Sequence, residues 1–183
     1  RTAGYASAVA TNGKVLVNEV DVARVPWKRC LEILAHELVH VSQYHLAGGW
    51  RGRSLQWLRE GFAEWGTAAA LDRLGFEPRE VRFAKARGKV RWVSEGGDLP
   101  TLRQLMNPPG WAAVQEKPDG AASYELAMLA TDFLISRIGI PAVIQYFRDS
   151  AVLDPRGNFA QAFGQSFFEF EAEFMMHLKE ILR

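Results

Sequence analysis

The pentapeptide His36-Glu37-Leu38-Val39-His40 is the most informative part of the sequence, because it spaces two histidines four residues apart within an expected helix. Residues at this spacing lie on one helical face, about 40° apart around the axis and one turn apart along it. Two imidazoles in this arrangement can bind one zinc ion, while the glutamate between them flanks the metal as a general base. The motif therefore predicts Zn²⁺, the metal ligands His36 and His40, and the base Glu37.

The residues around the motif predict a helix preceded by a small β-hairpin. Apolar side chains recur at helical spacing over residues 27–45, and Pro26 stands where a helix can begin. Residues 5–11 and 14–20 are rich in Val, Ala and Tyr, and they flank Asn12-Gly13, the preferred pair for a two-residue hairpin turn. We therefore expect a hairpin to open the domain, ahead of the helix that carries the histidines.

Further helices are expected along the rest of the chain. Apolar spacing favours them at residues 54–74, 77–91, 99–106, 122–138, 141–149 and 166–182. Gly48-Gly49 is expected to end the helix that carries the histidines. Asn107-Pro108-Pro109-Gly110 is expected to end the helix at residues 99–106. The fold class that follows is α+β and predominantly helical, with a small N-terminal sheet.

Composition narrows the class of protein and its partners. The chain has 183 residues, a length that predicts a single domain over residues 1–183, and its 22 basic and 21 acidic residues give a net charge of +1. This balance does not favour nucleic acid or an anionic membrane as the partner, and no apolar run is long enough to span a bilayer. The single cysteine, Cys30, excludes an internal disulfide framework. The oligomeric state is left open.

A catalytic zinc site needs a third protein ligand, with water in the fourth position. His45 follows His40 by five residues and lies about 140° around the helix from it, which is a poor position for the same metal. Cys30 lies nearly two turns before His36 and projects from another side of the helix. Glu60 is better placed, because it lies on the next expected helix, after a glycine-rich reversal that can return it antiparallel.

These segments resemble a known family. His36–His40 and the segment W-L-R-E-G-F-A-E-W at residues 57–65, with nineteen residues between His40 and Glu60, resemble the gluzincin metallopeptidases. Residues 99–106, 123–127 and 162–166 are similar to the bacterial peptidase MA-like group, so the likeness spans roughly residues 14–180. The resemblance implies a zincin-like domain in which His36, His40 and Glu60 bind Zn²⁺ and Glu37 is the base.

The resemblance also suggests two supporting residues. Thermolysin-like members of the family have an acidic residue at the position of Glu64, which can accept a hydrogen bond from a zinc-bound histidine; the alternative is a solvated glutamate. Aminopeptidase-like members use a tyrosine to stabilise the oxyanion, and Tyr124 lies at a comparable separation; the alternative is a core aromatic residue packed on Met128. Weaker candidates for the oxyanion donor are Tyr5, Tyr44, Tyr146 and His177.

The predicted function is that of a zinc-dependent peptidase acting on a peptide or protein substrate. The G-x-M-E-N segment by which aminopeptidases bind a free N-terminus is absent, so an endopeptidase is favoured over an exopeptidase. The strand at residues 14–20 is expected to form the cleft edge along which a peptide pairs. Two alternatives remain: a zinc-binding regulatory module without turnover, and a zinc amidase acting on a non-peptide substrate. The start at Arg1 and the common export of the family favour a secreted or periplasmic location.

Overall fold

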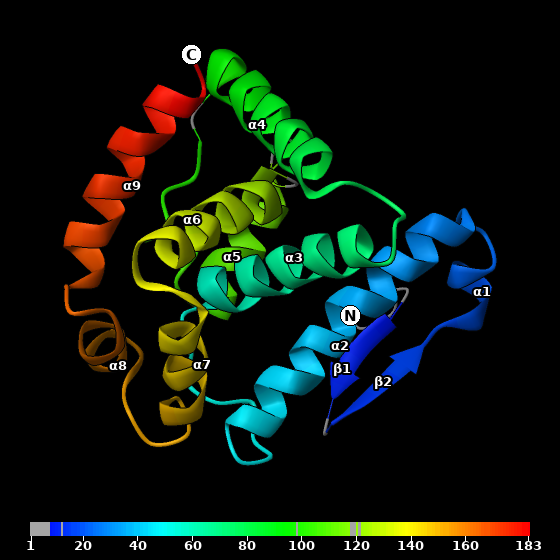
Figure 1. Cartoon of the computed structure of the whole chain (residues 1–183), viewed down its shortest axis with the longest axis horizontal. Coiled ribbons are helices and arrows are strands. Elements are labelled where there is room, and N and C mark those ends of the chain that lie inside the picture. The colour runs from blue at the N-terminus through cyan, green and yellow to red at the C-terminus, as the bar shows by residue number, and fades with distance from the viewer. Residues whose placement is uncertain (1–7, 12, 98, 118–119, 121) are drawn as a thin grey trace.

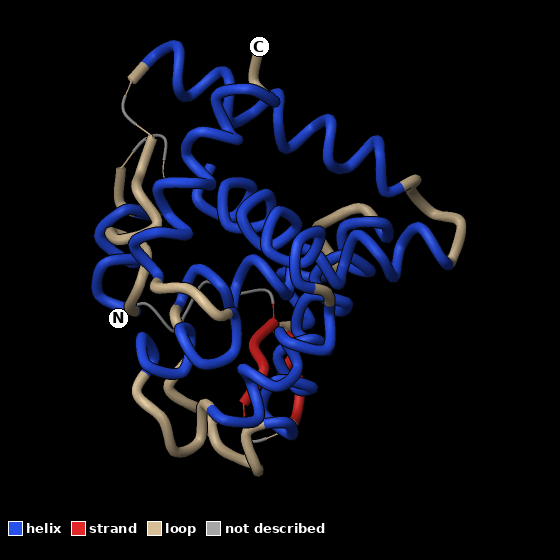
Figure 2. Tube along the Cα trace, turned by 60° about the vertical axis from the view of Figure 1, so that its left-hand side comes forward, coloured by secondary structure: helices blue, strands red, loops and turns tan. Residues whose placement is uncertain are grey.

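The computed structural model describes residues 8–11, 13–97, 99–117, 120 and 122–183. The described chain is predominantly helical, with one small antiparallel sheet at its N-terminal end (Figures 1 and 2), as predicted. Its elements are β1 (Ala8–Thr11), β2 (Lys14–Val17), α1 (Glu19–Val22), α2 (Trp27–Leu46), α3 (Gln56–Arg73), α4 (Arg79–Gly96), α5 (Pro108–Gln115), α6 (Ala122–Ile138), α7 (Ile140–Asp149), α8 (Pro155–Phe163) and α9 (Phe167–Ile181).

The hairpin forms where the Asn-Gly pair predicted it. Thr11 pairs with Lys14 at the turn, and the two strands run antiparallel beside α2. The second strand ends at Val17 rather than at residue 20, because the Asn18 side chain accepts backbone hydrogen bonds at the start of α1. Residues 5–7 of the first predicted strand, together with Asn12, lie outside the described residues.

The two helices that carry the zinc motifs confirm their predictions. Helix α2 follows Pro26 and ends before Gly48 and Gly49, which have φ angles of 70° and 87° that favour glycine. After this reversal α3 crosses back along α2 (Figure 1), so the histidine helix and the glutamate helix pack against each other. The antiparallel return that the glycine-rich segment suggested is therefore present.

The region between α3 and α6 differs from the prediction. Helix α4 is longer than the short helix expected at residues 77–91. Residues 99–106 form turns instead of a helix, and the segment expected to break the chain begins one. Asn107 accepts a hydrogen bond from the Gly110 N–H and caps α5, whose first two residues are Pro108 and Pro109. Proline fits the first turn of a helix because its missing N–H would be unpaired there anyway.

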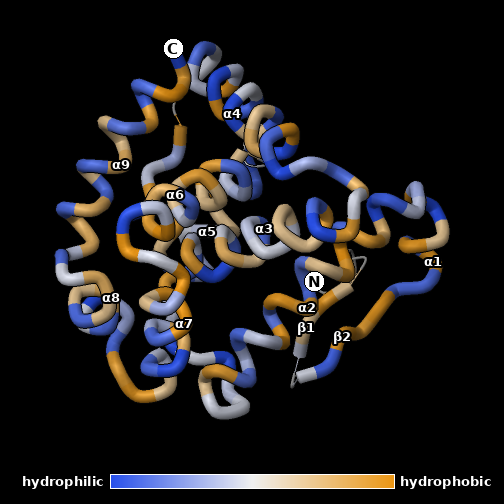
Figure 3. The backbone as a smooth tube through the Cα atoms, viewed as in Figure 1, coloured by the Kyte–Doolittle hydropathy of each residue, from blue (hydrophilic) through white to orange (hydrophobic). Residues whose placement is uncertain are grey.

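The C-terminal helices surround an aromatic core. Helices α7 and α9 confirm their predictions, whereas α8, capped by Asp154, was not predicted. Trp57 of α3 is fully buried and stacks on Phe170 of α9, with ring centroids 5.6 Å apart. Hydrophobic and hydrophilic residues alternate along α9 (Figure 3), as expected of a helix with one buried face. These rings hold the start of α3 from the side opposite α2.

Helix α3 lies unusually close to α6 at Gly61, the residue after Glu60. A Cβ at this position would overlap the Ala127 carbonyl oxygen and the Thr131 hydroxyl of α6. Glycine at 61 therefore sets the distance between the helix that carries Glu60 and the helix that carries Tyr124.

One finding bears on membrane association. Within the part of the chain that the structure describes, no single helix is long and apolar enough to cross a membrane. Helices α6 and α7 pass the same test of length and composition only as a pair, with a bend of 111° between them.

Gly61→Ala tests the close approach of α3 to α6. We expect the substitution to lower the free energy of unfolding by about 1–3 kcal/mol, because the added methyl group must push the helices apart. Gly88→Ala is the matched control, since a Cβ at this helical glycine of α4 meets nothing within 4 Å. There we expect a gain of roughly 0.5–1 kcal/mol from helix propensity. Chemical denaturation measures both values, and equal effects would contradict the packing argument.

Candidate metal centre

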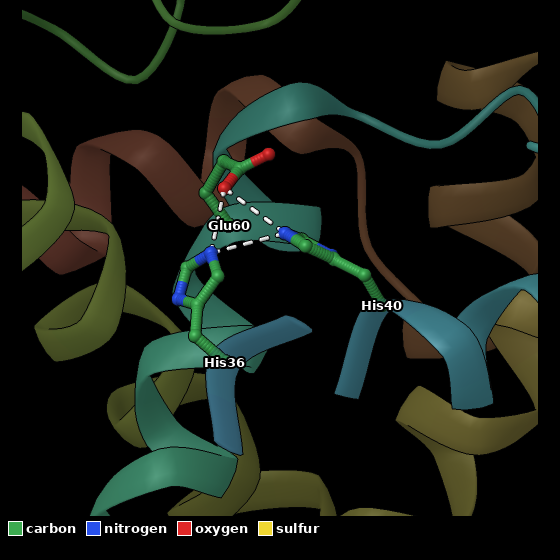
Figure 4. Close-up of side chains that lie close together, drawn as sticks. All are labelled: His36, His40 and Glu60. Carbon is green, nitrogen blue, oxygen red and sulfur yellow. Dashed lines mark hydrogen bonds and ion pairs between the residues drawn. The ribbon is translucent and has the colours of Figure 1, made fainter. Parts of the chain in front are cut away.

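Three side chains from α2 and α3 converge on one point. Nε2 of His36 lies 3.0 Å from Nε2 of His40, and these nitrogens lie 3.3 Å and 3.2 Å from Oε2 of Glu60 (Figure 4). In the described part of the chain, these residues form the one group of at least three His, Cys, Asp or Glu side chains with metal-binding spacing. The predicted ligand set is thus brought together, from helices joined by the nine residues 47–55.

The separations of these atoms fit a tetrahedral metal site. With bonds of about 2.0–2.1 Å to zinc, two ligand atoms of a tetrahedron lie about 3.3 Å apart. The three measured separations are 3.0, 3.2 and 3.3 Å. Two imidazole nitrogens and one carboxylate oxygen form a donor set typical of catalytic zinc, which keeps a fourth position open. The group can therefore hold a divalent cation such as zinc with little side-chain movement.

In both histidines, Nδ1 faces away from Glu60 and forms a hydrogen bond that orients the imidazole ring. Nδ1–H of His36 donates to Oε1 of Glu64 at 2.9 Å, and Nδ1–H of His40 donates to Oε1 of Gln43 at 2.8 Å. Such acceptors fix the ring and the tautomer of a metal-binding histidine, so that Nε2 carries the free lone pair. The predicted contact of Glu64 with a histidine is present.

Three residues that the sequence analysis missed support this arrangement. Gln43 also donates to the Arg59 carbonyl oxygen, which ties α2 to the turn of α3 that carries Glu60. Gln56 donates to Oε1 of Glu60 at 2.9 Å, and Arg82 of α4 donates to Oε2 of Glu64 at 2.8 Å. Gln43 and Gln56 stand one helical turn from a ligand, a spacing that would have identified them. Arg82 comes from another helix, and no local spacing signals it.

The carboxylates that contact His36 favour a positive charge at this group. Burial opposes protonation of His36, but hydrogen bonds to Glu60 and Glu64 outweigh it and raise its pKa to about 9. Burial alone would raise the pKa of both carboxyl groups. Hydrogen bonds from the histidines instead hold the pKa of Glu60 well below its ordinary value, and His36 and Arg82 lower that of Glu64 to about 2. Glu60 and the partly buried Glu64 therefore contact His36 from its two ring nitrogens, and a divalent cation beside Glu60 would supply the charge that the His36 proton otherwise supplies.

Glu37 lies beside the group, at the free edge of β1. Its Oε2 accepts a hydrogen bond from the Ala10 N–H at 2.6 Å. Because this N–H points away from β2, Ala10 occupies a non-hydrogen-bonded position of the ladder, and so does Ala8, two residues earlier. The edge of β1 therefore faces Glu37, and β1 borders the site. The prediction that residues 14–20 form this edge was wrong, because β2 pairs with the opposite side of β1.

Tyr124 reaches the same site from α6. Its ring centroid lies 6.0 Å from that of His36, and its other side packs on Trp111 of α5 at 4.9 Å. Burial raises the pKa of Tyr124 to about 12, with a further contribution from Glu60, so the phenol remains a hydrogen-bond donor at neutral pH. Tyr124 also packs against the hydrophobic core that contains Met128, as the alternative prediction expected, so its ring belongs both to the core surface and to the site.

The metal-binding group lies between two cavities along β1. On the His36 side, a cavity of about 490 Å³ is lined by Ala8, Glu37 and Tyr124 among others. On the His40 side, a cavity of about 540 Å³ is lined by Ala10 and Thr11 among others. Ala8 and Thr11 are the two ends of β1, so the strand extends from one cavity to the other past the three ligands.

The remaining sequence candidates lie elsewhere. Neither His45 nor Cys30 belongs to the ligand group, as the helical angles predicted. Tyr146 is a buried core residue whose hydroxyl oxygen accepts the Leu55 N–H, and His177 stacks on Phe133. Tyr44 lines the cavity on the His40 side, and Tyr5 lies outside the described residues.

Comparisons of the chain with protein-family models, curated proteins and solved structures found no match. The resemblance to gluzincins therefore stays a prediction from the motifs.

Glu64→Gln tests the role of the carboxylate behind His36. We expect zinc affinity to fall about 10- to 100-fold, because the substitution removes the charged acceptor that orients the imidazole. Asp72→Asn is the matched control, an exposed residue of the same helix. Competition with a fluorescent zinc chelator measures both affinities, and equal values in the two variants would show that Glu64 does not assist the ligand.

Proposed function

We propose that this protein is a zinc-dependent peptidase and that it cleaves within peptide chains. The observation that carries the proposal is the triangle of His36, His40 and Glu60 atoms, with Glu37 projecting beside it from the same turn of α2. A His-His-Glu set with an adjacent unligated glutamate is the arrangement that zinc hydrolases use for amide bonds.

When bound, zinc would lower the pKa of the attacking water and polarise the carbonyl of the scissile bond. Glu37 then acts as the general base: its carboxylate takes the proton of the water and delivers it to the amine that leaves. The hydrogen bond from the Ala10 N–H to Oε2 holds one carboxylate oxygen at the strand edge and leaves the other to accept the proton.

Tyr124 is the proposed donor to the oxyanion. It lines the same cavity as His36 and Glu37, and its phenol is neutral at physiological pH. Packing against Trp111 restrains the ring, so the hydroxyl is positioned before the negative charge develops on the substrate oxygen.

The strand edge and the two cavities support cleavage within a chain. An extended peptide can pair with the free edge of β1, through the outward backbone groups of Ala8 and the outward carbonyl oxygen of Ala10. A cavity lies at each end of this edge, so residues on both sides of the scissile bond have space. A site closed at one end would favour an exopeptidase instead.

The test measures zinc content and hydrolysis in the same preparations. Glu37→Gln should keep stoichiometric zinc and lose about 10²- to 10⁴-fold in turnover of a proteome-derived peptide library, because the base is removed. His40→Gln should lose the zinc itself. His45→Gln is the control on the same helix, five residues further on and exposed, and it should keep both zinc and activity.

The outcomes separate the possible functions. Zinc bound by the wild-type protein without cleavage of any peptide would favour a regulatory module, or an amidase for non-peptide substrates. Retained cleavage in Glu37→Gln would falsify the assignment of the base.

Tyr124→Phe tests the oxyanion donor separately from the metal. We expect turnover to fall about 10²- to 10³-fold with unchanged zinc content, because one hydrogen bond to the developing charge is lost. Tyr146→Phe serves as the control, because the Tyr146 hydroxyl lies in the core, where it accepts the Leu55 N–H, and this variant should retain most of its turnover. Steady-state kinetics with a cleaved library peptide decides, and wild-type turnover of Tyr124→Phe would contradict this role.

A further inference from the structure

The cavity on the His40 side differs in charge from the cavity on the His36 side. Its described lining residues include Arg51 and Arg59 and no carboxylate. The cavity on the His36 side has basic residues too, but Arg29 pairs with Glu32, and Arg82 with Glu64. The charge beyond His40 is therefore positive, whereas beyond His36 the four lining carboxylates outnumber the three basic side chains.

Neither arginine has an ion-pair partner among the residues that the structure describes. The charge of Arg51 acts unfavourably on Arg59, and the carboxylates that attract Arg59, Glu60 and Glu37, are turned toward the ligand group and the Ala10 N–H. Arg59 is only partly exposed. Leaving a partly buried guanidinium without a partner has an energetic cost that an anionic ligand would remove.

Arg59 is also fixed relative to the metal-binding group. It precedes Glu60 on α3, and its carbonyl oxygen accepts a hydrogen bond from Gln43, the residue that orients His40. Arg51 follows the Gly48-Gly49 reversal and lines the same cavity. Tyr44 and Trp50 add aromatic surface beside the two guanidinium groups.

We propose that this cavity is a carboxylate-binding subsite, so that the cleaved peptides carry a negative charge on the His40 side of the scissile bond. The inference rests on the proposed peptidase function and specifies its substrates. A guanidinium group binds a carboxylate through two parallel hydrogen bonds, and two such groups in one cavity select a charged group over its neutral amide.

The carboxylate has two possible sources, which correspond to the direction of the peptide along β1. The strand runs from the His36-side cavity to the His40-side cavity. An antiparallel peptide would bring residues N-terminal to the scissile bond into the arginine cavity, and the carboxylate would then be an acidic side chain. A parallel peptide would bring C-terminal residues there, where a free chain terminus can supply the charge as well.

The experiment uses the full chain loaded with zinc and peptides in matched pairs. One arm compares Glu with Gln at each position around the cleaved bond, and the other compares a free C-terminal carboxylate with its amide. We expect kcat/KM to favour the charged member by roughly 10- to 100-fold, as charge-assisted hydrogen bonds do. The preferred arm identifies the source of the carboxylate.

The arginine variants connect this preference to the cavity. Arg51→Gln should reduce the preference, and Arg51→Gln with Arg59→Gln should abolish it. Arg53→Gln is the matched control, an exposed arginine of the same loop that does not line the cavity, and it should keep the preference. A preference that persists in the double variant, with its fold verified by circular dichroism, would overturn the inference.

A second readout separates this inference from the proposed function. Zinc-loaded Glu37→Gln binds peptides without cleaving them, so fluorescence anisotropy can compare a labelled Glu peptide with its Gln counterpart. Equal cleavage and equal binding of the pair would refute the subsite and leave the peptidase function standing. Binding that prefers the charged peptide, with no cleavage by the wild-type protein, would support the subsite and refute the function.

Discussion

The packing of α3 against α2 on one side and α6 on the other is the constraint on which the site depends. Glu60 can meet the two histidines only while α3 lies along α2, and Tyr124 can reach His36 only while α6 lies close to α3. Gly61 satisfies the second condition, because its missing side chain lets the backbones approach directly beside the ligand. The same short segment of α3 thus supplies the candidate metal ligand Glu60, the helix contact at Gly61 and, at Arg59, a positive charge in the neighbouring cavity.

The candidate metal-binding group is stabilised by a network of partly buried charges. Glu64 receives hydrogen bonds from His36 and Arg82, and Arg82 also lies near Glu32 and Glu77. The network joins α2, α3 and α4, so the orientation of one imidazole depends on residues far from it in sequence. Loss of one of these partners would leave a carboxylate without its compensating charge, which has a large free-energy cost. The network therefore restrains the side chains that it joins.

Residues related by helical spacing could be predicted, and residues related only by tertiary packing could not. His36, Glu37 and His40 follow from one helix, and Glu60 and Glu64 follow from the reversal at Gly48-Gly49 and a second helix. The approach of Arg82 depends on how α4 packs, and the identity of the edge strand depends on which side of the hairpin faces α2. The break predicted at Pro108-Pro109 is instead the start of α5, because proline can interrupt a helix or begin one.

The hydrogen bond between the Ala10 N–H and Glu37 also limits how an extended peptide could pair with β1. In the peptidase proposed above, a peptide paired with β1 would use the outward groups of Ala8 and the Ala10 carbonyl oxygen, because the Ala10 N–H already donates to Glu37. The peptide carbonyl opposite Ala10 would then stay unpaired, next to Glu37 and the candidate ligands His36, His40 and Glu60. On the proposed function, the position where this pairing is interrupted would therefore determine which peptide bond of an extended chain is cleaved.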